Sequence, residues 1–423
     1  MLQFSTFSFI LSSFLLLLIL INKVIFNRPS TKGSDLKLPP GPRKLPVIGN
    51  LHQMIGELPH HRLNKLGKIY GPIFFLQLGK LPVITITTPD AAEEVLKTQE
   101  LAFSDHPQFP LAQMMGYENS SIFFAPYGEL WRQIRKICVL ELLGVKTVRS
   151  FKSIRQDEVS DLIAYIESSS GLPFDLSKRI SACMNRIVSK ACFGQTCKQQ
   201  DEFISSLYEA MKLAGGFGLA EKMQREHLGG QAGMPDKENL VNVLLRLQES
   251  NEIGFHLTTD NIKGIILELI SAGTESSSTT VEWAMSEMLK NPNVMVKAQN
   301  EIRQVLKGKD RIQESDIKEL NYLNCIIKET FRMHPPSPFI PRAPRQGCKI
   351  NGYDIPMNAR VLIHAYAIGR DPRYWTNPEK FEPERFMESS VDYKGCTISF
   401  FHLDLVGGSV QAWHLLQPAL NLY

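Results

Sequence analysis

The chain has 423 residues, of which 43% are hydrophobic and 21% are charged, and its formal net charge is +4. This composition is ordinary for a globular protein and leaves length for one large core or two smaller ones. The mild charge, without a basic stripe interleaved with aromatic residues, predicts no nucleic-acid partner. Seven scattered cysteines without a C-x-x-C pair argue against a disulfide framework or a zinc site and favour a reducing compartment.

The N-terminal stretch departs from this composition, because Phe4 to Phe26 is almost wholly apolar. A helix needs about 20 apolar residues to cross a bilayer, so we expect residues 1–27 to form a membrane anchor. The alternative is a cleaved secretory signal, whose apolar core runs only about 7–15 residues. Lys23, Arg28 and Lys32 follow the stretch, and positive charge stays cytoplasmic, which predicts a single-pass protein whose bulk faces the cytosol.

A Pro-rich linker over residues 28–50 follows the anchor. Its segment LPPGPRKLPVIGN is expected to be stiff and extended, a spacer between membrane and domain, because proline fixes φ and removes a backbone donor. Two strand-like runs in GPIFFLQLGKLPVITITTP, broken at Gly79 and Pro82, predict a hairpin. Pro89 and Asp90 then open a short helix, PDAAEEVLKT.

Most of the remaining chain is helical by its hydrophobic periodicity. The clearest helix runs from near Thr258 to Lys290, with Thr259 or Asp260 as its expected N-cap. A second helix is expected from near Ser315 through Arg332, where a pair of prolines follows.

The long helix contains the run Ala272-Gly273-Thr274-Glu275-Ser276. Glycine in a helix interior costs about 1 kcal/mol relative to alanine. One interpretation is a polar helix that packs at small residues. The other is a loosened turn that opens a groove and places the acid Glu275 beside the alcohol Ser276, where a proton must be delivered.

Two further pairs of side chains are candidates for binding a carboxylate or for forming an ion pair. Trp131 and Arg135 lie four residues apart on one helix face, and both side chains donate hydrogen bonds, which suits a carboxylate. A buried tryptophan beside an arginine that reaches solvent is the alternative. Glu329 and Arg332 also share a face, which alone predicts only a surface ion pair. With Arg385, in FEPERF, a second arginine is available to share Glu329 in a buried network.

The chain resembles the cytochrome P-450 superfamily of membrane-bound haem-thiolate monooxygenases. The resemblance rests on six features that occur in this order: the apolar anchor, P-P-G-P, W-x-x-x-R, A-G-T-E-S, E-x-x-R and P-E-R-F. The resemblance covers roughly Leu38 to Gly395. AGTESSSTTVEWAMSEM and AIGRDPRYWTNPEKFEPERF are similar to plant members that oxidise terpenoids, alkaloids or phenolics. The resemblance implies a mainly α fold with a small β-sheet region, in residues 51–395, and a haem held by a cysteine thiolate, the ligation for which these cytochromes are known.

The resemblance also implies residue roles and partners. Trp131, Arg135 and Arg342 match positions that hold haem propionates, Ala272 and Gly273 match the haem side of the oxygen-activation turn, and Thr274, Glu275 and Ser276 match its catalytic part. The family usually has threonine at Ser276, so oxygen activation is expected to be leakier. Glu329, Arg332 and Arg385 match the structural triad that supports the haem-ligand loop. The segments 104–124 and 336–340 should border a small hydrophobic substrate. Electrons would come from NADPH through a cytochrome P-450 reductase at the endoplasmic reticulum membrane.

Two departures from the family pattern stand out. After P-E-R-F the family has F-G-x-G-R-x-C-x-G, which this chain lacks; Cys396 arrives too soon and has no glycine loop before it. Residues 396–423 therefore form an aberrant tail and an incomplete C-terminus. The second departure is a segment shorter by a few dozen residues near 218–237, where helices normally roof the substrate pocket.

The tail itself suggests a cause. Read one base earlier, the codons of residues 401–422 admit L-P-F-G-L-G-R-R-I-C-P-G-M-A-F-A-T-A-S-I-E-L, with the missing cysteine at Val410. This compatibility predicts a one-base frame slip between about Tyr393 and His402. Two functions therefore remain: a haem-dependent monooxygenase, or an inactive truncated or pseudogene product that cannot ligate haem iron and so provides no metal ligand.

Overall fold

A computed structural model describes residues 36–107, 122–123, 125–194, 239–250, 255–307 and 316–387. The helices of this part are α2 Pro59–Tyr70, α3 Pro89–Glu93, α5 Glu129–Ile137, α6 Val145–Ser150, α7 Lys152–Ser168, α8 Leu176–Phe193, α10 Leu240–Ser250, α11 Thr259–Lys290, α12 Pro292–Leu306, α13 Asn321–Met333 and α14 Ala365–Ile368. Strands are β1 Ile73–Leu78, β2 Leu81–Ile86, β3 Ile340–Arg342, β4 Cys348–Ile350, β5 Tyr353–Ile355 and β6 Arg360–Ile363. The expected mainly α fold with a small β region is confirmed.

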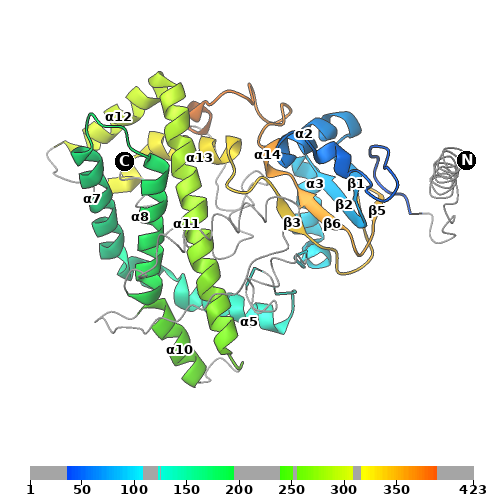
Figure 1. The fold of residues 1–423 in the computed structure, drawn as a ribbon, viewed down its shortest axis with the longest axis horizontal. Coiled ribbons are helices and arrows are strands. Elements are labelled where there is room, and N and C mark those ends of the chain that lie inside the picture. Colours follow the sequence, from blue (N-terminus) through cyan, green and yellow to red (C-terminus); the bar gives the residue numbers. More distant parts are fainter. Residues whose placement is uncertain are drawn as a thin grey trace, which may run out of the picture.

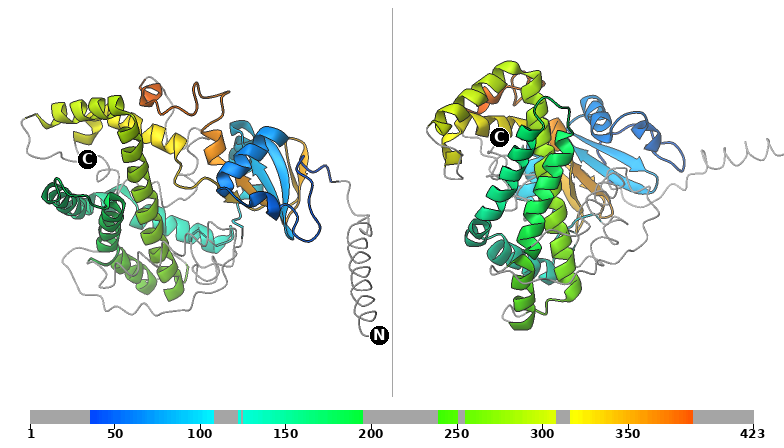
Figure 2. Two further views of the ribbon diagram at one scale, coloured as in Figure 1. Left: turned by 45° about the horizontal axis from the view of Figure 1, so that its top comes forward. Right: turned by 60° about the vertical axis from the view of Figure 1, so that its left-hand side comes forward.

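The helices α7 and α8 lie on one side of the long helix α11, and the sheet lies on the other side (Figure 1). Figure 1 shows α7, α8 and α11 side by side, with α12 across one end and α10 at the other. A four-stranded sheet in the order β1-β2-β6-β3, with α2 and α3 beside it, lies beyond α13 (Figure 2). One large apolar cluster fills the helical part, and two smaller clusters flank the sheet.

The predicted hairpin is confirmed. β1 and β2 pair antiparallel from Ile73 opposite Ile86 to Leu78 opposite Leu81. β2 then pairs parallel with β6, and β6 pairs antiparallel with β3, so the sheet joins the start of the domain to residues 340–363. The helix expected from Pro89 is also present, as α3 followed by a π-helical turn, Glu94–Thr98.

Two helix starts differ from the prediction. The N-cap of α11 is Thr258, not Thr259 or Asp260, because Thr258 and Asn261 form a capping box. The helix α13 starts at Asn321, not near Ser315. A separate turn, Asp316–Glu319, precedes it, and Glu301 of α12 accepts the N–H groups of Tyr322 and Leu323 at 2.7 and 3.0 Å.

The Pro-rich segment runs along the edge of β1. Phe75 donates its backbone N–H to the carbonyl of Pro40 at 2.8 Å, and Asn50 donates its backbone N–H to the Gln77 carbonyl. Asn50 also accepts from the Gln77 N–H at 2.8 Å. The segment is extended and non-helical over 36–44, and it is docked on the sheet rather than standing free of it.

This docking yields a stability prediction. A Cβ atom on Gly41 would collide with the Phe75 carbonyl oxygen, so Gly41→Ala should push the segment away from β1 at a cost of about 1–3 kcal/mol. We expect faster limited proteolysis within residues 36–50. Gly347→Ala is the matched control, because its Cβ would meet nothing within 4 Å. Equal cleavage rates in both variants would contradict the docking.

No described helix has the length and apolar character required to cross a bilayer. The predicted anchor, the shortened segment near 218–237 and the tail with Cys396 and Val410 lie outside the described residues.

Candidate functional site

The turn Ala272–Ser276 lies within α11, near its middle. The structure has one uninterrupted helix from Thr259 to Lys290, which agrees with the first of the two interpretations, a polar helix, and not with a loosened turn. The hydroxyls explain why the helix persists: Ser276 donates to the Ala272 carbonyl at 2.6 Å, and Ser278 donates to the Thr274 carbonyl at 2.9 Å. In such bonds the serine hydroxyl donates to the carbonyl four residues earlier, so its hydrogen-bonding capacity is satisfied within the helix.

Thr274 and Ser276 point to different sides of α11. Successive residues of a helix are rotated by about 100°, so positions two apart lie on nearly opposite faces. The Thr274 side chain is 1% exposed and accepts from the Asn185 amide of α8 at 3.4 Å. The structure therefore separates Thr274, which packs against α8, from the hydroxyl of Ser276.

Glu275 is a partly buried acid on the same turn. Burial raises the pKa of the Glu275 carboxyl, and the neighbouring Glu282 raises it further. A carboxyl with a raised pKa holds its proton closer to neutral pH, which is a property of groups that donate protons in catalysis. Gly273 is buried, and its missing side chain leaves room for close approach of a ligand to the α11 backbone.

Trp131 and Arg135 share one face of α5, and the Arg135 guanidinium lies 5.1 Å from the Trp131 ring. Among the described residues neither pairs with a carboxylate. The Trp131 indole donates instead to the backbone carbonyl of Ile122 at 2.9 Å.

Arg342, in β3, is a buried cation. Arg342 is 5% exposed. Its pKa is lowered to about 10, because burial lowers it by more than the attraction to Glu100 raises it. It forms no ion pair within the described part of the chain, and its guanidinium bonds only to the carbonyl of Pro341, at 2.8 Å. A buried, unpaired charge is costly, so this position fits a carboxylate supplied by a ligand.

His106 lies near Arg342, within the segment 104–124 that was expected to border the substrate, although no role was predicted for this residue itself. Burial, and the positive charge of Arg342, lower the pKa of His106 to about 3. Its ring stacks on Phe123 at 5.6 Å, and its Nδ1 atom has no hydrogen-bond partner in the described regions. The only signal in the sequence was a lone histidine before a proline, which carries little information.

Glu329, Arg332 and Arg385 come together in one buried network. Arg332 binds both Glu329 oxygens, at 2.7 and 2.8 Å, and Arg385 binds one of them at 3.1 Å. Arg332 also donates to the carbonyls of Gly369, Pro378 and Lys380. The arginines thereby fix the chain around the 3₁₀ turn Pro383–Phe386.

None of the described cysteines is suited to bind iron as a thiolate. Burial raises the pKa of Cys183 and Cys192 to about 12 and that of Cys348 to about 11, and it also raises the pKa values of Cys138 and Cys325. No group of three metal-binding side chains occurs in the described regions. The described residues thus fit the carboxylates of a haem, at Arg342, and among them no cysteine is placed to bind its iron.

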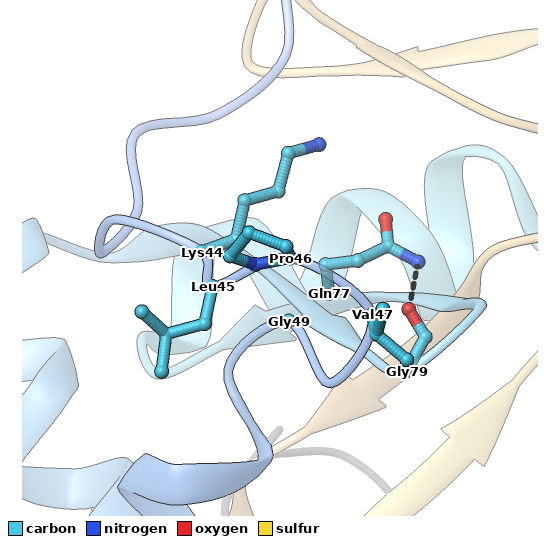
Figure 3. Close-up of a pocket in the computed structure, with 7 residues that line it drawn as sticks. All are labelled: Lys44, Leu45, Pro46, Val47, Gly49, Gln77 and Gly79. Carbon is cyan, nitrogen blue, oxygen red and sulfur yellow. Dashed lines mark hydrogen bonds between the residues drawn. The ribbon is translucent and has the colours of Figure 1, made fainter. Parts of the chain in front are cut away.

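A hollow of about 360 Å³ lies between the Pro-rich segment and the β1–β2 hairpin (Figure 3). It is lined by Lys44, Leu45, Pro46, Val47, Gly49, Gln77 and Gly79. None of the candidate residues borders it, so we assign it no chemistry.

Comparison with known proteins gives one consistent family. A family model described as Cytochrome P450 matches residues 39–214 and 219–400. A melianol synthase of Ailanthus altissima is 44% identical over 94% of this chain and 82% of its own. A premnaspirodiene oxygenase of Hyoscyamus muticus is 41% identical over 90% of this chain and 82% of its own.

Two further proteins, one plant enzyme and one solved structure, are also similar to this chain. A desmethyl-deoxy-podophyllotoxin synthase of Sinopodophyllum hexandrum is 43% identical over 93% of this chain and 84% of its own. A zebra fish cytochrome P450, solved with abiraterone, superposes with a TM-score of 0.68 at 23% identity, covering 86% of this chain and 90% of that one. The last similarity concerns the fold alone.

Proposed function

Because the chain belongs to the cytochrome P450 family, we propose that its fold serves a haem-dependent monooxygenase that inserts one oxygen atom of O2 into a small hydrophobic metabolite. The relatives named for melianol, premnaspirodiene and a podophyllotoxin support a terpenoid, alkaloid or phenolic substrate. Electrons would pass one at a time from NADPH through a membrane-bound cytochrome P450 reductase.

The observation that carries this proposal is Arg342. A guanidinium 5% exposed and without an ion-pair partner in the described part of the chain needs an anion, and the propionates of a haem supply two. Trp131 and Arg135 would hold the same edge of the haem from α5. When bound to iron through a thiolate, haem supplies the activation of dioxygen.

The side chains of α11 would transfer protons and would determine how closely the haem approaches the helix. Glu275, with its raised pKa, would release a proton at its carboxyl oxygen towards the Ser276 hydroxyl, which would pass it on to the reacting site. Ala272 and Gly273 would let the macrocycle lie close to the helix. Thr274 has a packing role against Asn185 in this proposal. Glu329, Arg332 and Arg385 would hold the turn that leads into the iron-ligand loop.

The second candidate function is an inactive product. It is favoured by the absence of F-G-x-G-R-x-C-x-G from the sequence and by the family match, whose second segment comprises residues 219–400 and not the tail from Phe401. We propose that a one-base slip between about Tyr393 and His402 produced this tail. Sequencing of genomic DNA and transcript across the interval tests this: a continuous frame without a slip would refute it.

Carbon monoxide binding distinguishes the two functions. We expect the chain as written, reduced under carbon monoxide, to show no thiolate-type shifted Soret band, because it has no suitable cysteine. The frame-restored chain should show the band. A band from the chain as written would exclude the inactive function. A restored chain that folds, by far-UV circular dichroism, but gives no band would contradict the monooxygenase proposal.

We also propose that residues 1–27 anchor the protein once in the endoplasmic reticulum membrane, with the domain in the cytosol. The apolar run Phe4–Phe26 and the basic residues after it support this. Protease treatment of sealed microsomes should digest the domain from outside; full protection would contradict the orientation.

A further inference from the structure

A single peptide group connects α5 to α11. The carbonyl of Ile122 accepts the Trp131 indole N–H at 2.9 Å, and the N–H of Phe123 donates to the Glu268 carboxylate at 3.0 Å. These two atoms belong to the same peptide unit, so one rigid plane is held from both sides. Glu268 lies one helical turn before Ala272 in α11.

The neighbouring residues restrain the same stretch. The Phe123 ring stacks on His106, and the Tyr127 backbone N–H donates to the Asp105 carboxylate at 2.9 Å. Asp105 in turn accepts the Ala343 N–H at its backbone carbonyl, beside β3. Hydrogen bonds thus connect Asp105 to Tyr127 and to the sheet, and the bond from Phe123 to Glu268 connects the same stretch to α11.

The bond to Glu268 has the character of a strong contact. A carboxylate that accepts a backbone N–H forms a charge-assisted hydrogen bond, which is shorter and stronger than a neutral one. The opposite bond, from an indole, is neutral. Loss of Glu268 therefore removes the stronger of these two bonds and weakens the hold on the peptide whose carbonyl accepts from Trp131.

We propose that Glu268 is a positioning residue that fixes the Ile122–Phe123 peptide and, through it, the indole of Trp131. This rests on the proposed function, in which Trp131 binds the haem edge and the segment borders the substrate. Glu268 thereby sets the distance between the haem-edge helix α5 and the oxygen-activation turn of α11. Neither its spacing nor its residue type marked it in the sequence.

Glu268→Ala, Glu268→Gln and Trp131→Phe test the proposal on the full chain without added haem. We expect hydrogen exchange at the Phe123 amide to become about tenfold faster in E268A, the change expected for loss of one charge-assisted hydrogen bond. E268Q keeps an acceptor oxygen and should stay within about threefold of the original chain. The fluorescence of Trp131, obtained by subtracting the matching Trp131→Phe protein, should shift to longer wavelength in E268A but not in E268Q.

Glu129→Ala is the matched control, since Glu129 is exposed on α5 and bonds Arg132 and Gln133 of its own helix. Unchanged Phe123 exchange in E268A, or an equal change in the control, would overturn the proposal. If E268A does not fold, Trp131→Phe alone still tests the clamp, because removing its bond should also speed Phe123 exchange. Both readouts are independent of iron ligation, so the carbon monoxide experiment reports separately on the proposed function.

Discussion

Arg332→Ala should destabilise the protein by about 3–5 kcal/mol, the cost of breaking a buried ion pair from one side. Arg332 is 1% exposed, and its loss would leave Glu329 with Arg385 as its remaining charged partner. The backbone carbonyls of Gly369 and Pro378 would lose the Arg332 donor at the same time, and that of Lys380 would keep its longer bond from Arg385, at 3.4 Å. Because total domain stability is typically about 5–15 kcal/mol, most of the protein is expected to be insoluble or unfolded.

Equilibrium denaturation with urea measures the effect. Arg385→Ala should cost less, because the Arg385 side chain is 11% exposed and shares only one oxygen of Glu329. Arg303→Ala, at an exposed position of α12, is the control and should stay within about 0.5 kcal/mol. A midpoint for Arg332→Ala equal to that of the control would show that the network contributes no stability.

His364→Phe should make the protein more resistant to acid. His364 is fully buried, and neither ring nitrogen has a hydrogen-bond partner among the described residues. Burial, together with the nearby His60, Arg370 and His61, lowers its pKa to about 3. The unfolded chain thus binds a proton at higher pH than the folded one, so the stability is fully present above about pH 6.5 and is lost as pH falls towards 3.

At pH 5 this loss amounts to roughly 2 kcal/mol relative to pH 7 for one such histidine. Phenylalanine keeps the stacking on Phe339, whose ring lies 4.8 Å away, but binds no proton. Urea midpoints at pH 7 and pH 5 should therefore differ less in His364→Phe than in the original chain. The exposed control His256→Phe should retain the original difference. Identical pH dependence in all three proteins would contradict the account.

The short-range features of this fold were predictable. Two strand-like runs broken at Gly79 and Pro82 predicted the β1–β2 hairpin, and the 3.6-residue period predicted α11. The helix boundaries were less accurate. Asn261 completes a capping box with Thr258, and Glu301 reaches across from α12 to the start of α13, so these starts depend on individual side-chain contacts.

The candidate site shows the same division. The spacing of Glu329 and Arg332 predicted that they share a helix face, but only the approach of residues 369–385 makes their pair a buried network. Helical periodicity did not reveal that Thr274 packs against α8 or that Ser276 satisfies its hydroxyl within the helix. His106 and Glu268 carried no usable signal, because their importance comes from neighbours far away in sequence.

The sequence by itself determined the fold class and the chemistry for which the fold is suited, because ordered motifs and hydrophobic period are local properties of the chain. That the chain lacks the iron-binding loop stays a prediction, made from the absence of F-G-x-G-R-x-C-x-G after P-E-R-F. The tertiary structure decided which polar groups are buried and which of them have a hydrogen-bond or ion-pair partner among the described residues. Arg342 shows the reason: its charge becomes significant because folding removes it from water, and no carboxylate of the described residues forms an ion pair with it.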